Sequence, residues 1–159
     1  MRAFRLNGFD TAPEIEELPR PVPQEGEALV RIAACGLNFA DLLMLTGRYQ
    51  DTPAPPFTMG MEVAGIVEAL GQNTDGPAPG TRVAVFAGEG GLAEAGCFPV
   101  ARMVPIPDAM PFDQAAGFLV AYGTSHLALD HRARLLKGER LLVLGAAGGV
   151  GLTAVEIGA

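Results

Sequence analysis

The feature that most constrains the fold is an apolar run that leads directly into a glycine-rich turn. Arg140-Leu-Leu-Val-Leu144 is typical of a parallel strand buried on both faces, and Gly145-Ala-Ala-Gly-Gly-Val-Gly151 follows it, before a stretch of helical composition. Gly148 and Gly151 occupy the second and third glycine positions of GxGxxG, with Ala146 at the first. A strand, turn and helix in this order bind dinucleotide phosphates, because glycine lets the backbone approach the pyrophosphate and the helix N-terminus offers free N–H groups. We therefore predict cofactor binding by Ala147, Gly148, Gly149, Val150 and Gly151. An ordinary glycine-rich turn between a strand and a helix is the alternative.

The residues before this turn predict a β-rich body. Twenty-one Gly and 13 Pro among 159 residues leave room for few long helices. Apolar runs predict strands at 28–34, 63–67 and 82–86, with weaker strand signals through 103–106. The prolines of 52–57 predict an extended loop, because proline excludes helix there.

Two helical segments interrupt the strands. Residues 39–45 predict a short helix, with Asn38 as its N-cap and Asp41 three positions further on as the second member of a capping box. Residues 112–129 have helical composition, with a kink expected at Gly117 or Gly123.

The pattern divides the chain into a β-rich domain at 1–110, a helical connector at 111–138 and the start of a nucleotide-binding domain at 139–159.

Charge and cysteine content limit the partners and the compartment. The net charge is −7 and no basic cluster occurs, so neither nucleic acid nor an anionic membrane is an expected partner. The N-terminus lacks the apolar segment of a signal peptide, and the longest charge-free runs are shorter than the ~18 residues that a membrane span needs. Two cysteines without a framework spacing fit a reducing compartment, so we expect a cytoplasmic protein.

Four segments together resemble the medium-chain dehydrogenase/reductase superfamily in order and spacing. They are Ala34-Cys-Gly-Leu-Asn-Phe-Ala-Asp41, Gly60-Met-Glu-Val-Ala-Gly65, Gly91-Leu-Ala-Glu94 and Gly145–Gly151. The resemblance implies a mainly β fold with α: a GroES-like β-barrel catalytic domain, followed by the first βα unit of a truncated Rossmann domain. It also implies that such a chain continues beyond this point and returns to complete the catalytic domain, with the active site between the two domains.

Within the superfamily, the chain resembles the zinc-free quinone oxidoreductases. Asn38 and Met61 stand where zinc-dependent relatives carry a Cys and a His, and 116–122 offers no Cys, Asp, Glu or His as a third ligand. Catalytic zinc needs three protein ligands, so we expect no metal. His126 and His131 are expected to be helix-surface histidines, and Glu62 is expected to be structural.

The quinone oxidoreductase resemblance implies hydride transfer from NADPH to a quinone or an enone. Asn38, Asp41 and Tyr49 are then the catalytic residues: Asn38 and Thr124 contact the nicotinamide end, while Asp41 and Tyr49 line the acceptor pocket, with Tyr49 as a proton donor. From the residues alone, Asn38 and Asp41 could serve only as helix caps, Tyr49 as a loop tyrosine and Thr124 as a kink residue. NADH is not excluded, because the residue that selects the coenzyme lies roughly 20 positions beyond the glycine turn.

Two other functions remain open from the same resemblance. One is an enoyl-thioester reductase, and the other is a vesicle-amine-transport-like protein with a binding rather than a catalytic role. For the quinone reductase, the expected partners are a small-molecule quinone or enone acceptor and a second copy of the chain in a homodimer. Because most of a cofactor domain is missing from 1–159, we expect these residues alone to be inactive.

Overall fold

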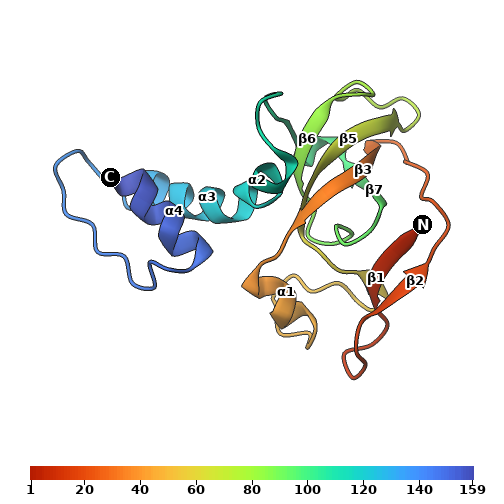
Figure 1. Ribbon diagram of the computed structural model, residues 1–159, viewed down its shortest axis with the longest axis horizontal. Helices are drawn as coiled ribbons and strands as arrows, with labels where there is room; N and C mark the ends of the chain where they lie inside the picture. Colours follow the sequence, from red (N-terminus) through yellow and green to blue (C-terminus); the bar gives the residue numbers. More distant parts are fainter. The chain divides into compact units, whose positions relative to one another are not determined.

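The computed structural model describes residues 1–159, which form two compact units, Met1–Gly117 and Phe118–Ala159 (Figure 1). The division falls at Gly117, inside the segment 111–138 for which the sequence predicts a helical connector.

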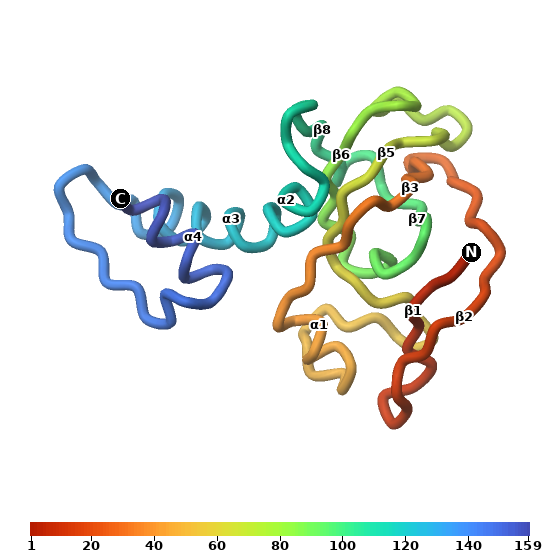
Figure 2. The backbone as a smooth tube through the Cα atoms, viewed as in Figure 1, coloured from red at the N-terminus to blue at the C-terminus, as the bar shows by residue number.

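The first unit is built from two antiparallel sheets. Its strands are β1 (Arg2–Leu6), β2 (Glu14–Glu17), β3 (Glu27–Gly36), β4 (Phe57–Thr58), β5 (Glu62–Leu70), β6 (Arg82–Phe86), β7 (Ala95–Pro99) and β8 (Met103–Pro105). One sheet has the order β2-β1-β4, and the other has the order β7-β3-β5-β6-β8. Figure 2 shows β3, β5 and β7 side by side although they are far apart in the sequence. An isolated antiparallel bridge joins Ala3 of β1 to Ala93, in the segment before β7.

The core cluster of this unit is formed by residues of the five-stranded sheet and explains why the apolar runs form strands. Alternate residues of β3, β5 and β6 point inward, because side chains alternate between the two faces of a strand. The central cluster consists of Ala28, Val30, Val63, Val67, Val83, Val85, Phe98 and Met103. The predicted strands at 28–34, 63–67 and 82–86 and the extended segment at 52–57 are therefore confirmed.

Two short α-helices belong to this unit, one between β3 and β4 and one after β8. The helix α1 (Phe39–Met44) follows β3 directly, as predicted, with Asn38 as its N-cap. A 3-10 turn (Val100–Arg102) precedes β8, and the helix α2 (Phe112–Ala116) closes the unit. The predicted break falls at Gly117, the C-cap of α2. Gly123, the other candidate, lies inside a helix.

The second unit consists of paired helices joined by an irregular segment. The helix α3 (Phe118–His126) continues into a π-helical turn, η2 (Leu127–Arg132), and α4 (Gly149–Gly158) follows the glycine-rich segment. The helix predicted after Gly151 is confirmed. The strand predicted at 140–144 is wrong: these residues form no strand, and Leu142 and Leu144 are 82% and 85% exposed. A strand exists only through its ladder hydrogen bonds, and no other extended segment of this unit pairs with these residues.

Candidate functional site

The first feature of the candidate site is a carboxylate placed over a glycine. In the β3–β5 register, Gly36 at the end of β3 faces Glu62 at the start of β5. A Cβ at Gly36 would lie 2.6 Å from Oε1 of Glu62 and 2.3 Å from the carbonyl oxygen of Ala116. Only glycine leaves room for both groups, and the Glu62 side chain is therefore buried, with 2% of the residue exposed.

Asn38 is held next to this carboxylate by two contacts. Its side-chain Nδ2 donates to Oε1 of Glu62 at 2.8 Å. Its backbone N–H donates to Oδ2 of Asp41, also at 2.8 Å, in the capping box that begins α1. A short helix with a satisfied N-terminus holds its first residues in one conformation. Both the main chain and the side chain of Asn38 are thus fixed by carboxylates.

Asp41 is itself a buried acid. The residue is 6% exposed, and its Oδ1 has no hydrogen-bond partner. Burial raises the pKa of the Asp41 carboxyl above its ordinary value, because the charged form loses its hydration. The backbone N–H groups of Asn38, Met61 and Gly60 act in the opposite direction and lower this pKa. Asp41 therefore serves α1 as a cap but carries a desolvation cost that a surface cap would not.

Cys35 lies beside the two acids. Burial raises the pKa of its thiol to about 12, and the negative charges of Asp41 and Glu62 contribute in the same direction. A thiol with this pKa stays protonated at neutral pH and is a poor nucleophile. Cys35 therefore belongs to the packing around the site and not to its chemistry.

Tyr49 lines a separate small cavity of about 300 Å³. Met61 and Phe86 supply apolar lining, and the other lining residues are Asp51, Pro53, Ala87, Gly88, Glu89 and Arg102. The carbonyl oxygen of Met61 accepts the N–H groups of Ala87 at 2.8 Å and Gly88 at 2.9 Å, which fixes one wall of this cavity. Of the three predicted catalytic residues, only Tyr49 lines it. Asn38 and Asp41 belong to the cluster around Glu62.

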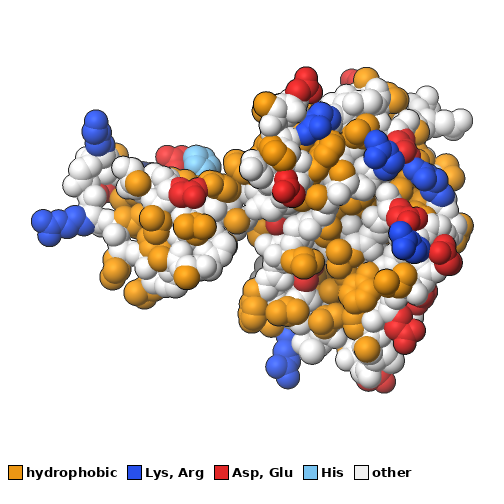
Figure 3. Space-filling model, viewed as in Figure 1, with side chains coloured by type: hydrophobic (Ala, Val, Ile, Leu, Met, Phe, Trp, Pro, Cys, Tyr) orange, Lys and Arg blue, Asp and Glu red, His pale blue; other side chains and the backbone are white.

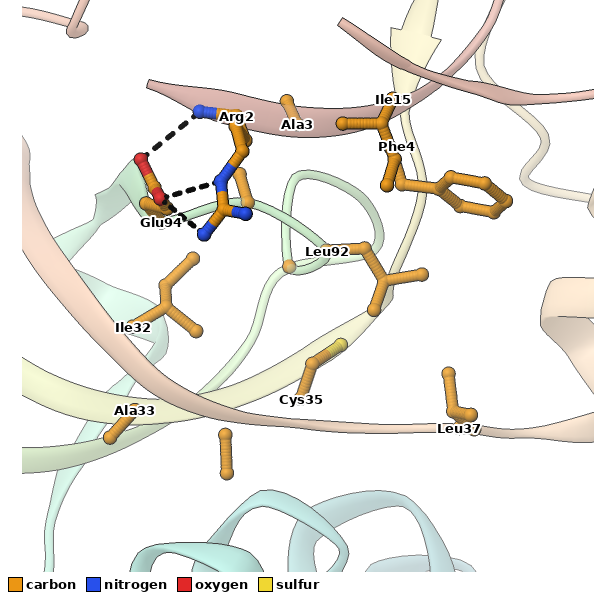
Figure 4. Close-up of a pocket in the computed structure, with 13 residues that line it drawn as sticks. Arg2, Ala3, Phe4, Ile15, Ile32, Ala33, Cys35, Leu37, Leu92 and Glu94 are labelled. Atoms are coloured by element: carbon orange, nitrogen blue, oxygen red, sulfur yellow. Dashed lines mark hydrogen bonds and ion pairs between the residues drawn. The ribbon is translucent and has the colours of Figure 1, made fainter.

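A larger groove of about 650 Å³ lies on the same unit (Figure 4). The Arg2–Glu94 ion pair lies at one end, with 3.0 Å between Nη2 and Oε1, and Leu37 lies at the other. The lining between them is mostly apolar and includes Phe4, Ile15, Ile32, Ala33, Cys35 and Leu92. None of the predicted catalytic residues lines this groove.

Exposed apolar side chains surround the start of α1. Leu37 and Phe39 are each 74% exposed, and Leu42 is 59% exposed. In Figure 3 hydrophobic side chains gather over this helix. Exposed apolar groups in such a patch mark a surface used for binding more often than scattered single residues do. The polar group of Asn38 therefore lies at the edge of an apolar surface.

The glycine-rich turn of the second unit has the backbone features that a diphosphate requires. Gly145 adopts a positive φ of 71°, and a Cβ at Gly151 would lie 2.2 Å from the carbonyl oxygen of Gly145. The first helical bond of α4 runs from the Leu152 N–H to the Gly148 oxygen at 2.8 Å, so the N–H groups of the first helical turn stay free. A Cβ at Gly149 would meet nothing within 4 Å. The turn thus presents open backbone at a helix N-terminus.

A buried pair of hydroxyl groups holds this turn against α3. Ser125 and Thr153 are 1% and 6% exposed, with 2.8 Å between their oxygens. Both hydroxyl oxygens also lie within hydrogen-bond distance of the carbonyl oxygen of Val150 in the glycine-rich segment, at 2.7 and 3.0 Å. Thr124, the predicted nicotinamide contact, precedes Ser125, is exposed, and donates its hydroxyl to the Val120 oxygen. The Ser125 and Thr153 hydroxyls thus hold Val150 of the glycine-rich segment against α3, while Thr124 takes no part in these contacts.

The acidic, histidine and cysteine side chains form no group suited to a metal ion. No three His, Cys, Asp or Glu side chains lie together in such an arrangement. Met61, at one of the positions where zinc-dependent relatives carry a ligand, is buried with 2% exposed. Freedom from zinc stays a prediction. None of the helices has the length and apolar character that crossing a membrane requires.

Comparison with known proteins identifies the family. Residues 24–108 match the family model described as the alcohol dehydrogenase GroES-like domain. The chain belongs to this GroES-like family. The predicted membership in the medium-chain dehydrogenase/reductase superfamily and the mixed β and α fold class are confirmed.

Relatives of this GroES-like chain carry names from both catalytic and membrane-associated proteins. The human synaptic vesicle membrane protein VAT-1 homolog-like is 39% identical over 159 residues, which cover 99% of this chain and 38% of the relative. Mouse quinone oxidoreductase is 38% identical over 162 residues, covering 99% of this chain and 49% of the relative. The chain thus spans half or less of the length of these relatives.

Solved structures similar to this chain include a quinone oxidoreductase and an enoyl reductase. The quinone oxidoreductase from Thermus thermophilus, solved also as its NADPH complex, superposes with a TM-score of 0.87 at 40% identity, covering 99% of this chain and 49% of that one. The CurK enoyl reductase superposes with a TM-score of 0.87 at 31% identity, covering 98% and 50%. The relatives of this GroES-like chain are oxidoreductases together with VAT-1 proteins.

The contact between Glu62 and Asn38 was not predicted from the sequence. Glu62 was expected to be structural, and its carboxylate accepts from the side chain of Asn38. The signal that could have indicated this contact was Gly36, a glycine at the end of an otherwise regular strand. A glycine in a strand often marks close approach by another group. The approaching group depends on strand register, which the sequence did not supply.

Proposed function

We propose that the GroES-like unit is the acceptor-binding half of an NADPH-dependent reductase of quinones or enones. The observation that carries the proposal is the fixed polar side chain of Asn38, held by Glu62 and Asp41 at the edge of an apolar surface. It is supported by relatives named quinone oxidoreductase and enoyl reductase.

The cavity lined by Tyr49 suits a small acceptor. Its volume of about 300 Å³ lies at the lower end of ordinary ligand pockets, which favours a compact substrate with one or two rings. Met61 and Phe86 offer apolar contact to a planar ring, and the phenol of Tyr49 is a donor for an oxygen of the acceptor. We therefore propose benzoquinones, naphthoquinones and short enones as the substrate class.

The glycine-rich turn fits the diphosphate of a dinucleotide, because it combines open backbone at Gly149 with free N–H groups at the start of α4. Ala147, Gly148, Val150 and Gly151 remain proposed phosphate contacts, and Asn38 and Thr124 remain proposed contacts of the nicotinamide end. NADPH is the proposed coenzyme, as in the solved complex of the Thermus thermophilus relative.

The protein's own residues have a limited chemical task in this reaction. Bound NADPH would supply a hydride, and the acceptor gains that hydride together with one proton. Asn38 orients the nicotinamide ring, and apolar side chains around α1 exclude water. Tyr49 donates a proton to the acceptor oxygen that becomes negative during reduction. A quinone is already electrophilic, so orientation contributes more to the rate than proton transfer does.

A second function is favoured by the resemblance to VAT-1 proteins, whose identity to this chain is nearly the same as that of the quinone oxidoreductases. In that case the apolar surface over α1 would bind a partner and no acceptor would turn over. A cytoplasmic location, a homodimer and inactivity of residues 1–159 alone remain predictions.

The two tyrosines of the chain provide a matched test. In the full-length protein, Tyr49→Phe should lower kcat for naphthoquinone about tenfold through loss of the proton donor, with the acceptor KM nearly unchanged. Tyr122→Phe is the control, because Tyr122 stacks on Phe118 and donates to Glu156 in the second unit. Equal effects of the two substitutions would remove Tyr49 from the mechanism. Absence of any turnover in the wild-type protein would favour the binding function.

A further inference from the structure

Glu62 is buried although burial of a carboxylate is costly. The residue is 2% exposed at the first position of β5, where its neighbours Met61 and Val63 are also buried. A buried acid contributes little net stability compared with an apolar residue of similar size. Its presence at this place is therefore better explained by the contact it makes than by stabilisation of the core.

The group that Glu62 holds is the amide of Asn38. Nδ2 donates to Oε1 at 2.8 Å, so Oε1 of Glu62 is the acceptor in this contact. Reversal of the amide would place Oδ1 of Asn38 against Oε1, which is repulsive. Glu62 thus selects one of two amide orientations that have almost the same shape. Gly36 leaves the space that the carboxylate occupies, because any Cβ at this position would collide with it.

The main chain beneath the amide is fixed independently. The Asn38 N–H donates to Asp41 Oδ2, and the Asp41 N–H donates to the Asn38 carbonyl oxygen at 3.0 Å. Because these contacts fix the backbone, the side-chain torsions are the remaining freedom of Asn38. The capping box restricts them from the Asp41 side, and Glu62 holds the Nδ2 end of the amide. A loss of Glu62 should therefore change the amide while leaving α1 intact.

We propose that Glu62 is a positioning residue that fixes the Asn38 amide in the orientation used to bind the nicotinamide end of the coenzyme. The coenzyme part rests on the proposed function, whereas the contact between Glu62 and Asn38 does not. Glu62 acts through Asn38 and touches no reacting atom.

The first test follows the Asn38 amide in the 159-residue chain by nuclear magnetic resonance. In the wild-type protein a scalar coupling across the hydrogen bond should join ¹⁵Nδ2 of Asn38 to ¹³Cδ of Glu62. Glu62→Met keeps the volume but removes the acceptor, so exchange of the Asn38 side-chain protons with water should accelerate about tenfold. Glu62→Gln can still accept through Oε1 and should restore most of the protection.

Glu68→Met is the matched control for this test. Glu68 lies on the same strand, but it is partly exposed and forms ion pairs with Arg20 and Arg31. This substitution should leave the Asn38 signals unchanged. Absence of the wild-type coupling, or Asn38 exchange that is the same in Glu62→Met as in the wild type, would overturn the positioning role. If Glu62→Met does not fold, the wild-type coupling and Glu62→Gln decide the question.

The second test separates positioning from plain stability in the full-length protein. Glu62→Met should raise the KM for NADPH about fivefold to tenfold with kcat within about threefold of wild type, and Glu62→Gln should bring KM back to within about threefold. An unchanged KM would show that the fixed amide does not face the coenzyme and would overturn that part. If the wild-type protein reduces no acceptor, the proposed function fails, while the resonance experiment still decides whether Glu62 holds Asn38.

Discussion

The two units of this chain contain similar apolar residues, but these residues are buried in the first unit and exposed in the second. In Met1–Gly117 the valines of β5 and β6 are almost fully buried: Val63, Val67, Val83 and Val85 are at most 1% exposed. In Phe118–Ala159 the apolar run before the glycine turn is open to solvent, and Leu142 and Leu144 are more than four-fifths exposed. Both segments have strand-forming composition, but only the first has partner strands.

This difference shows which parts of a fold a sequence segment can form alone. Helices satisfy their backbone hydrogen bonds within the segment, so α3 and α4 form and pair through Ser125 and Thr153. A parallel strand buried on both faces needs a neighbour on each edge and a layer on each face. The GroES-like unit supplies all of its own neighbours, whereas the second unit does not.

Hydrogen exchange should show the largest contrast between the units. The Val83 N–H lies in β6 between β5 and β8, and Leu142 lies in no strand. We expect the Leu142 amide to exchange near its unprotected rate in the 159-residue chain and Val83 to be protected at least about 1000-fold more. Mass spectrometry or nuclear magnetic resonance measures both amides. Comparable protection of the two would mean that residues 140–144 have found a partner strand.

A pair of truncations should give the next largest difference. Phe98 is 3% exposed in the core cluster, and Phe98→Ala should reduce the free energy of unfolding by about 3–5 kcal/mol. Leu142→Ala should change it by less than about 0.5 kcal/mol, because the side chain is already in water. Urea unfolding followed by circular dichroism gives both values. A cost above about 2 kcal/mol for Leu142→Ala would contradict the contrast.

Thiol reactivity should give a smaller but more local contrast. At pH 8 Cys35, whose pKa is raised to about 12, should react with iodoacetamide at least about 30-fold more slowly than a cysteine introduced by Leu142→Cys. Compared with a cysteine of ordinary pKa 9.0, the thiolate fraction of Cys35 is about 1000-fold smaller. The greater nucleophilicity of a more basic thiolate offsets about 30-fold of that difference. The Cys35 rate should still rise tenfold per pH unit at pH 10, where the exposed thiol has levelled off. Similar rates and pH profiles, measured by peptide mass spectrometry, would show that Cys35 is not buried beside the two acids.

The sequence predicted those features that depend on local pattern. The strands at 28–34, 63–67 and 82–86 follow from apolar runs, and α1 follows from Asn38 and Asp41 at capping-box spacing. The contact between Glu62 and Asn38 could not be predicted, because it depends on a register that joins Gly36 to a residue 26 positions away. The same reason explains the wrong strand at 140–144, since its composition specifies burial but not the partners that provide it.

We propose that the Asn38 side chain, fixed in the GroES-like unit, belongs to an NADPH-dependent reductase. The most direct measurement is NADPH oxidation by the full-length protein at 340 nm with 1,4-naphthoquinone, together with product analysis. We predict saturable oxidation with one hydroquinone formed per NADPH, and an NADPH KM that rises about tenfold in Asn38→Ala. No NADPH oxidation above the protein-free rate with naphthoquinone, benzoquinone or an enone would contradict the claim.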